Sequence, residues 1–190
     1  MSDHPAMLVI AGQAFEIVDA AFGCHLGLRA GGWRPCLSLD VRARAGWREA
    51  RILTPSFAVE FPALDVLEGV ALDVPAPVDL PGLPTWPAFV LHIHDDQEIR
   101  RPRLSFGHFD GDRLPACLTG FVDVEDDDGN VAHDAALALS APLRFDGVVV
   151  DEGWTHKAEE RLAQFFDRAS FDAPVKRPDG AHVFRRKLGP

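Results

Sequence analysis

Apolar and polar residues alternate with a period of two through most of this chain, and this pattern constrains the fold more than any other feature. Leu37, Leu39 and Val41 alternate with polar neighbours, and side chains two apart on a strand point to the same face of a sheet. The pair Gly31-Gly32 separates this run from an earlier alternating run. We predict a β-hairpin here, because glycine adopts the positive φ that tight turns need.

Comparable stretches recur along a β body that we place at residues 6–152. The expected strands lie at residues 51–61, 66–74, 88–94, 103–109, 114–124, 131–143 and 148–150. The Asp-Gly pair within residues 125–130 predicts another hairpin. Five prolines in residues 75–87 exclude helix and regular strand, and predict an extended connection between two halves of one sheet system. The fold class expected is mainly β, as an antiparallel sandwich or a flattened barrel of hairpins.

One amphipathic C-terminal helix is predicted over residues 155–170, with Thr155 as its cap. Leu162, Phe165 and Phe166 fall on one helical face and are its expected buried anchors. A basic tail follows at residues 175–190, which either docks on the body or frays. The length of 190 residues suits a single domain, 1–190, containing all these parts.

The charge of the chain is unevenly spread. The net charge is −10, yet residues 154–190 hold eight Lys and Arg against five Asp and Glu. Residues 1–153 hold 11 against 24. An acidic body repels nucleic acid and anionic membranes and attracts a basic protein partner. Solubility alone is the other explanation of such a charge.

The three cysteines, Cys24, Cys36 and Cys117, are too few and too widely spaced for a disulfide framework. Each has apolar neighbours, so we expect buried free thiols in a reducing compartment. The N-terminal sequence does not resemble a secretory signal, and no stretch is long and apolar enough for a membrane span. We therefore expect a cytoplasmic protein.

A metal site is one candidate function. His92 and His94 are two residues apart on an expected strand, so they would share a face, and Glu98 follows. Imidazole and carboxylate ligands suit a divalent transition metal. The H-x-H-x3-E spacing resembles the first metal motif of the cupin family, which implies a metal-dependent β-barrel enzyme or sensor. The other interpretation is a polar strand end without metal, and stoichiometric metal lost on His92→Ala would separate the two.

The acidic turn is the second candidate site. Glu125, Asp126, Asp127 and Asp128 follow one another, and like charges held together repel. We interpret this turn as a contact surface for a cationic partner or as a solvated hairpin tip. No nucleophile motif, dinucleotide motif or phosphate-binding loop occurs in the sequence, so no cofactor is expected and an enzyme is left open but disfavoured. The profile favours a non-catalytic binding or inhibitor protein, similar in size and charge to bacterial immunity proteins.

Overall fold

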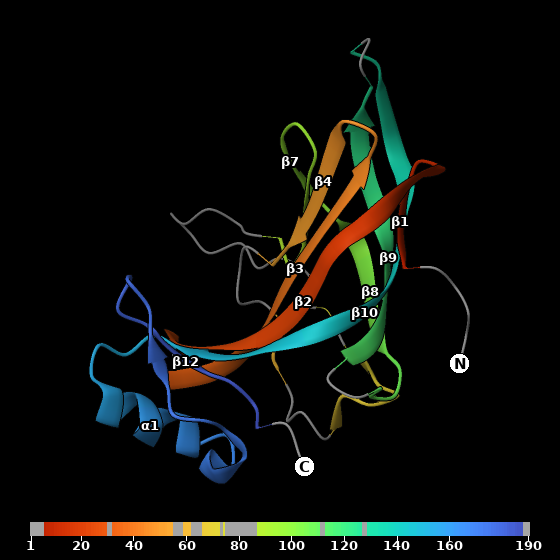
Figure 1. Cartoon of the computed structure of the whole chain (residues 1–190). Helices are drawn as coiled ribbons and strands as arrows, with labels where there is room; N and C mark the ends of the chain where they lie inside the picture. Colours follow the sequence, from red (N-terminus) through yellow and green to blue (C-terminus); the bar gives the residue numbers. More distant parts are fainter. Residues whose placement is uncertain are drawn as a thin grey trace.

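The computed structural model describes residues 6–29, 32–54, 59–61, 66–72, 74, 87–110, 113–126 and 129–187, and these ranges consist mainly of antiparallel strands (Figure 1). The strands are β1 (Met7–Ile10), β2 (Gln13–Arg29), β3 (Gly32–Ala45), β4 (Arg48–Leu53), β5 (Ala71–Leu72), β6 (Val90–His92), β7 (Asp96–Glu98), β8 (Arg100–Phe106), β9 (Arg113–Glu125), β10 (Val131–Val150), β11 (Val175–Lys176) and β12 (His182–Phe184). The helix α1 (Thr155–Ala163) and a 3-10 turn at Arg168–Ser170 follow β10. The predicted class, mainly β with a C-terminal helix, is confirmed.

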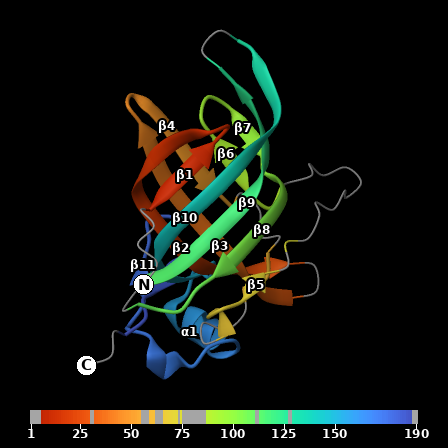
Figure 2. The same cartoon turned by 90° about the vertical axis from the view of Figure 1, so that its right-hand side faces the viewer.

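The strands form one strongly curled sheet. Its order is β5-β8-β9-β10-β1-β2-β3-β4-β6-β7, and β12 is added beside β10. The strands β7 and β8 lie far apart in this order but are consecutive in the chain, with only Ile99 between them. The sheet therefore curls round on itself in the manner of a flattened barrel, and among the described residues no pairing between its two edges closes it (Figure 2).

The short strand β1 lies between β2 and β10. Met7 pairs with Glu16 of β2 and with Ser140 of β10. Beyond Met7, the first residue of β1, β2 and β10 meet directly and pair in parallel, from Ala21 opposite Arg144 onward. Neither β1 nor this parallel pairing was predicted from the sequence, since alternation within a strand carries no information about distant partners.

Both predicted hairpins are confirmed. β2 and β3 pair antiparallel up to Arg29 opposite Gly32, whose φ is 119°. The alternating residues Leu37 and Leu39 of β3 are buried, as the pattern requires. β9 and β10 pair antiparallel from Glu125 opposite Val131. Local alternation with turn residues was therefore sufficient to place these strand pairs.

Several strand limits differ from the prediction. The strand expected at 66–74 is reduced to β5, because Val70 N donates to Leu67 O in a turn and Gly69 has a φ of 70°. The strand expected at 88–94 narrows to β6, and the one expected at 103–109 begins earlier, at Arg100. The proline-rich connection lies outside the described residues except for its last member, Pro87.

The prediction for Cys117 is wrong. Along β9 the side chains of Leu114, Leu118 and Val122 are fully buried, while Cys117 points outward and is exposed. The alternation of side chains along a strand explains this exposure, because Cys117 must face solvent when its neighbour Leu118 faces the core. Cys24 and Cys36 are buried as expected. Burial also raises the pKa of the Cys24 thiol far above its ordinary value.

The helix is shorter than predicted. α1 ends at Ala163, and Thr155 is its first residue, while Trp154 occupies the N-cap without a side-chain hydrogen bond. Asp167 is extended, and its carboxylate accepts from Ala169 N and Ser170 Oγ, which starts the separate 3-10 turn. Of the expected anchors only Leu162 is fully buried. Phe165 and Phe166 lie beyond the helix, partly buried against the core.

The C-terminal segment docks on one end of the barrel, beside α1 (Figures 1 and 2). β12 pairs with the end of β10 and fully buries Phe184. The basic tail makes aromatic contacts here, with the Arg186 guanidinium 5.6 Å from the ring centroid of Phe109. The described part of the basic tail, which ends at Lys187, is therefore docked on the body and not frayed.

A fully buried histidine joins the C-terminal strand to the helix. The Nδ1 atom of His182 lies 2.8 Å from Glu152 O, and its Nε2 lies 3.0 Å from the hydroxyl of Thr155. A carbonyl oxygen can only accept, so Nδ1 carries the proton, and in the neutral ring Nε2 accepts from Thr155. The hydroxyl that was expected to cap the helix therefore satisfies a buried imidazole instead.

Candidate functional site

The end of the barrel opposite α1 contains a cavity of about 280 Å³. We call it the mouth cavity. Its lining comes from four separate connections: Ile10, Ala11, Gln13 and Phe15 from β1–β2, Arg48 from β4, Ile93 from the β6–β7 turn, and Val124, Glu125, Asp126, Asn130, Val131 and Ala132 from β9–β10. The mouth of a β-barrel is a common place for a ligand, because the strands hold converging loops in fixed positions.

The middle of the mouth cavity is apolar. Ile10 and Phe15 are buried there, at 2% and 1% exposed. They lie on neighbouring antiparallel strands that pair through Ile10 opposite Gln13, and both face inward by alternation. Ile93 and Val124 are partly buried and pack against the same core. Apolar ligand atoms that entered the cavity would therefore be removed from water.

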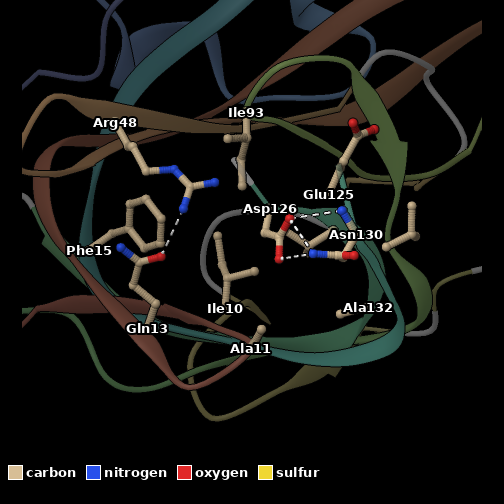
Figure 3. A pocket seen from close by; sticks show the side chains of 12 residues that line it. Ile10, Ala11, Gln13, Phe15, Arg48, Ile93, Glu125, Asp126, Asn130 and Ala132 are labelled. Carbon is tan, nitrogen blue, oxygen red and sulfur yellow. Dashed lines mark hydrogen bonds between the residues drawn. The ribbon is translucent and has the colours of Figure 1, made fainter. Parts of the chain in front are cut away.

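One side of the mouth cavity carries a guanidinium and an amide. Arg48 is the first residue of β4, and its Nη1 donates to Oε1 of Gln13 at 3.3 Å. The turn before it includes Gly46, with a φ of 62°, and Trp47, whose side chain is 76% exposed. Figure 3 shows Arg48 and Gln13 together on this side.

The opposite side of the mouth cavity carries Asp126 and Asn130 (Figure 3). The backbone N of Asn130 donates to Asp126 Oδ1 at 2.8 Å, and its Nδ2 donates to Oδ2 at 3.1 Å. Gly129 completes the turn with a φ of 82°. Charge repulsion was our reason to expect a function for this turn, but Asp126 also stabilises the hairpin by accepting these bonds.

The predicted partner-binding residues are placed in part. Glu125 and Asp126 are exposed and line the mouth cavity, whereas Asp127 and Asp128 lie outside the described residues. Asp95 is exposed on the β6–β7 turn, and a hollow of about 30 Å³ brings it together with Glu125. We call Asp95, Glu125 and Asp126 the acidic rim. It gives this end of the molecule a negative edge, with Arg48 as a cation inside it.

The predicted metal ligands are not brought together. His92 ends β6, and its Nδ1 lies 2.9 Å from Asp96 Oδ1. His94 lies in the turn beyond the strand, so the period-two rule does not place it on the face of His92. Glu98 is exposed at the end of β7. Among the described residues no three His, Cys, Asp or Glu side chains are grouped to hold a metal, and the metal hypothesis has only the sequence spacing as support.

An ion-pair cluster beside the mouth was not predicted. Arg100 of β8 donates to both carboxylate oxygens of Asp123 on β9, at 3.1 and 2.7 Å, and to Asp134 of β10 at 2.9 Å. Asp123 also accepts from Asp134 N. The hydrogen bonds from Arg100 hold the pKa of Asp123 well below its ordinary value, helped by the Asp134 N–H and by His133. The same pairing raises the pKa of Arg100.

Arg48, Gln13 and Asn130 were not predicted as site residues. Arg48 and Gln13 are separated by two strands in the chain and meet only because β2, β3 and β4 are neighbours in the sheet. In the sequence, Gln13 and Arg48 each follow a glycine-containing turn, at Gly12 and Gly46. Such a turn predicts the end of a hairpin, but it does not predict which hairpin ends meet in the fold.

Comparison with protein-family models, with curated proteins and with solved structures finds no match for this chain. In the part of the chain that the structure describes, no helix has the length and apolar character to cross a membrane.

Proposed function

We propose that this is a non-catalytic binding protein that holds a positively charged protein partner at the mouth of the barrel. The observation that carries the proposal is an apolar cavity of about 280 Å³ edged by the acidic rim. The class that we propose, by analogy of size and charge, is an inhibitor of the bacterial immunity type that acts in a reducing cytoplasm. Its free thiols at Cys24, Cys36 and Cys117 suit that compartment.

The mouth cavity is large enough to receive a side chain of a partner. Its volume of about 280 Å³ is close to the lower limit of pockets for small molecules and cofactors, which span about 300–1,000 Å³. A few side chains buried in well-packed pockets supply most of the affinity of a protein interface. The exposed Trp47, immediately before Arg48, adds an aromatic contact of the kind that is enriched at such interfaces.

The acidic rim favours a basic partner. Its carboxylates lie on two connections, β6–β7 and β9–β10, that are neighbours around the mouth. Opposite charges across an interface mainly accelerate the encounter and select the partner, while apolar contacts supply the lasting affinity. A cationic segment with an apolar anchor would use both parts of the site.

A random peptide library displayed on phage tests the proposal while the partner itself is still unidentified. We expect selection on the wild-type protein to enrich peptides that combine Lys or Arg with an apolar residue. The double variant Glu125→Gln/Asp126→Asn should bind those peptides several-fold more slowly at low salt, because it removes two charges from the rim. Asn at 126 keeps an oxygen that can accept from Asn130.

The matched control is Glu160→Gln/Asp172→Asn, which removes two exposed carboxylates at the opposite end of the molecule. Equal slowing by both double variants would mean that net charge, and not the mouth, attracts the peptides. Enrichment of acidic or uncharged peptides would contradict the proposal directly.

A further inference from the structure

The edge of β10 that faces β1 is open near the mouth. The pairing of β1 with β10 ends at Leu137, and the N–H of Ala11 donates to Ala136 O just beyond it. Residues 131–135 continue past this point, and in the described part of the chain no backbone hydrogen bond reaches them from the side of β1. Figures 1 and 2 show the β9–β10 hairpin projecting beyond the end of β1.

The pairing of β10 with β9 determines which backbone groups face this open edge. The N–H of Asp126 donates to Asn130 O, and Ala132 is the next residue of β10 that bonds toward β9, because bonded and non-bonded pairs alternate. The C=O and N–H of a trans peptide unit point in opposite directions. The N–H and C=O of Val131 and the N–H of His133 are therefore directed at the open edge.

The open edge borders the mouth cavity. Val131 and Ala132 line this cavity across from Ala11. A strand paired with this edge would extend the row of β1, and its alternate side chains would face the apolar middle of the cavity at Ile10 and Phe15. An added strand can therefore form backbone hydrogen bonds and bury an apolar anchor at the same place.

The open edge carries little protection against pairing. The bulge in β10 interrupts the strand beyond His133, but Lys and Pro, which also commonly protect sheet edges, are absent from residues 131–135. Residues 114–143, which form most of the hairpin, contain six Asp and Glu and neither Lys nor Arg. Two copies of this chain paired along the edge would bring these carboxylates together, whereas a basic strand has complementary charge.

We infer that the open edge at residues 131–133 binds an extended basic segment of the partner as an added strand; this inference rests on the proposed function. The partner residue opposite Ala132 places an apolar side chain in the mouth cavity. Its Lys or Arg neighbours lie near the exposed Glu125, which is paired with Val131 across the hairpin. The backbone bonds fix the extended conformation, and the side chains select the sequence.

A fluorescent heptapeptide of sequence Lys-Val-Lys-Leu-Lys-Val-Lys, blocked at both ends, tests the inference by anisotropy. Each of its three central residues is N-methylated in turn. We expect binding to weaken about tenfold or more where the lost N–H faces β10, and to change little at the next residue. This alternation is specific to an added strand, because a peptide bound as a helix or through its side chains alone has no period of two. If the heptapeptide does not bind, the same scan is made on the tightest basic peptide from the library.

Two variants at one position locate the added strand on the protein. Val131→Pro removes an N–H that faces the open edge and not β9, and proline is tolerated at such edge positions. We expect it to weaken the peptide about tenfold, while the matched control Val131→Thr, also β-branched, keeps the wild-type affinity. Far-UV circular dichroism and thermal unfolding establish that both variants are folded.

Hydrogen exchange followed by NMR gives an independent measurement on the wild-type protein, should Val131→Pro fail to fold. Peptide binding should slow exchange of the Val131 and His133 amides about tenfold or more, since both gain a hydrogen bond. The Ala132 amide already bonds toward β9 and should change less. Unchanged exchange at Val131 in the saturated complex would contradict the inference.

The outcomes separate the inference from the proposed function. If a basic peptide binds at the mouth and Glu125→Gln/Asp126→Asn slows it, yet N-methylation shows no alternation, the added strand is wrong and the basic-partner proposal stands. If no basic peptide binds, both are wrong. If the protein alone sediments as a dimer that Val131→Pro converts to a monomer, the edge serves a second copy and the inference is wrong.

Discussion

Gly147 marks the closest approach between three strands that are distant in the chain. It lies in β10 with a φ of 108°, and a Cβ at this position would overlap the carbonyl oxygen of Phe184 in β12. On the other side, a Cβ at Gly23 of β2 would lie 2.8 Å from Gly147 O. Two glycines therefore allow β2, β10 and β12 to meet.

We expect Gly147→Ala to destabilise the protein by about 1–3 kcal/mol, from backbone strain at the positive φ and displacement of β12. Gly153→Ala is the matched control, since an added Cβ at Gly153 has no heavy atom within 4 Å among the described residues. Urea unfolding of the two variants measures the difference. Equal stabilities would show that β12 does not press on β10 at this point.

Single residues also show where prediction from the sequence was limited. The alternation along β9 that buries Leu114 and Leu118 also places Cys117 outside, whereas the general tendency of cysteine to be buried predicts the opposite. The metal hypothesis assumed that the strand with His92 continues to His94, whereas β6 ends at His92. Strand ends depend on tertiary contacts, and a one-residue error in a strand changes which side chains share a face.

At the scale of elements, one β-bulge lies on each side of β9, in β8 opposite Gly120 and in β10 opposite Asp123. The β8–β9 register shifts between Arg100 and Arg103, and the β9–β10 register shifts between Ala132 and Ala135. Non-glycine residues at these bulges have positive φ, 49° at Arg101 and 50° at Asp134. Asp123 of β9 is hydrogen bonded to both bulged strands, so it stabilises an otherwise strained arrangement.

The lowered pKa of Asp123 predicts a loss of stability in acid. A carboxylate with a folded-state pKa below its unfolded value of about 3.9 stabilises the protein fully above that pH, and its contribution falls as the pH drops toward the folded pKa. In Asp123→Asn we therefore expect lower stability at pH 7 and a shallower decline between about pH 4 and pH 2. Urea unfolding at several pH values measures this slope.

Some acid dependence should remain in Asp123→Asn, because the hydrogen bond from Arg42 also lowers the pKa of Asp19. Asp172→Asn serves as the comparison, as its exposed side chain lies near the C-terminal strand and away from the bulges. Identical slopes for wild type and Asp123→Asn would contradict a stabilising role for the cluster.

The helix shows why an apolar period does not determine an element's end. Phe165 and Phe166 continue the helical spacing of Leu162, yet they lie beyond α1 and still pack against the core. Burial of an apolar side chain in the core is favourable whether or not the backbone that carries it is helical. The hydrogen bonds of Asp167 end the regular structure here. An aspartate commonly bonds nearby backbone N–H groups at turns, and this competed with the helical period of the two preceding phenylalanines.

At the scale of the whole molecule, local pairs were predictable and the curling of the sheet was not. The β2–β3 and β9–β10 hairpins follow from alternation and turn residues, which act over short separations. The insertion of β1 between β2 and β10 brings together residues more than a hundred positions apart. The mouth cavity depends on these long-range pairings, and its residues from four connections could not be assembled from the sequence alone.

The two ends of the barrel differ in how they are covered. One end is covered by α1 and β12 over a group of aromatic rings, with Phe166 and Phe171 at a 6.0 Å centroid distance. The other end is the mouth. Leu162 and Phe184 at the covered end belong to the same buried cluster as Ile10 and Phe15 at the mouth. The single domain expected from the sequence stays a prediction, and this continuity is the reason to test it by unfolding.

A single domain should unfold in one transition when its covered end is weakened. Phe184→Ala removes a fully buried ring, and we expect a loss of about 3–5 kcal/mol. Unfolding is followed in a background that retains Trp47, at the mouth, as its only tryptophan. Far-UV circular dichroism and Trp47 fluorescence should then report the same lowered midpoint of unfolding. Peptide binding at the mouth should stay unchanged below that midpoint, because Phe184 does not line the cavity. If the Trp47 signal kept the wild-type midpoint while the dichroism shifted, the two ends would be separate folding units.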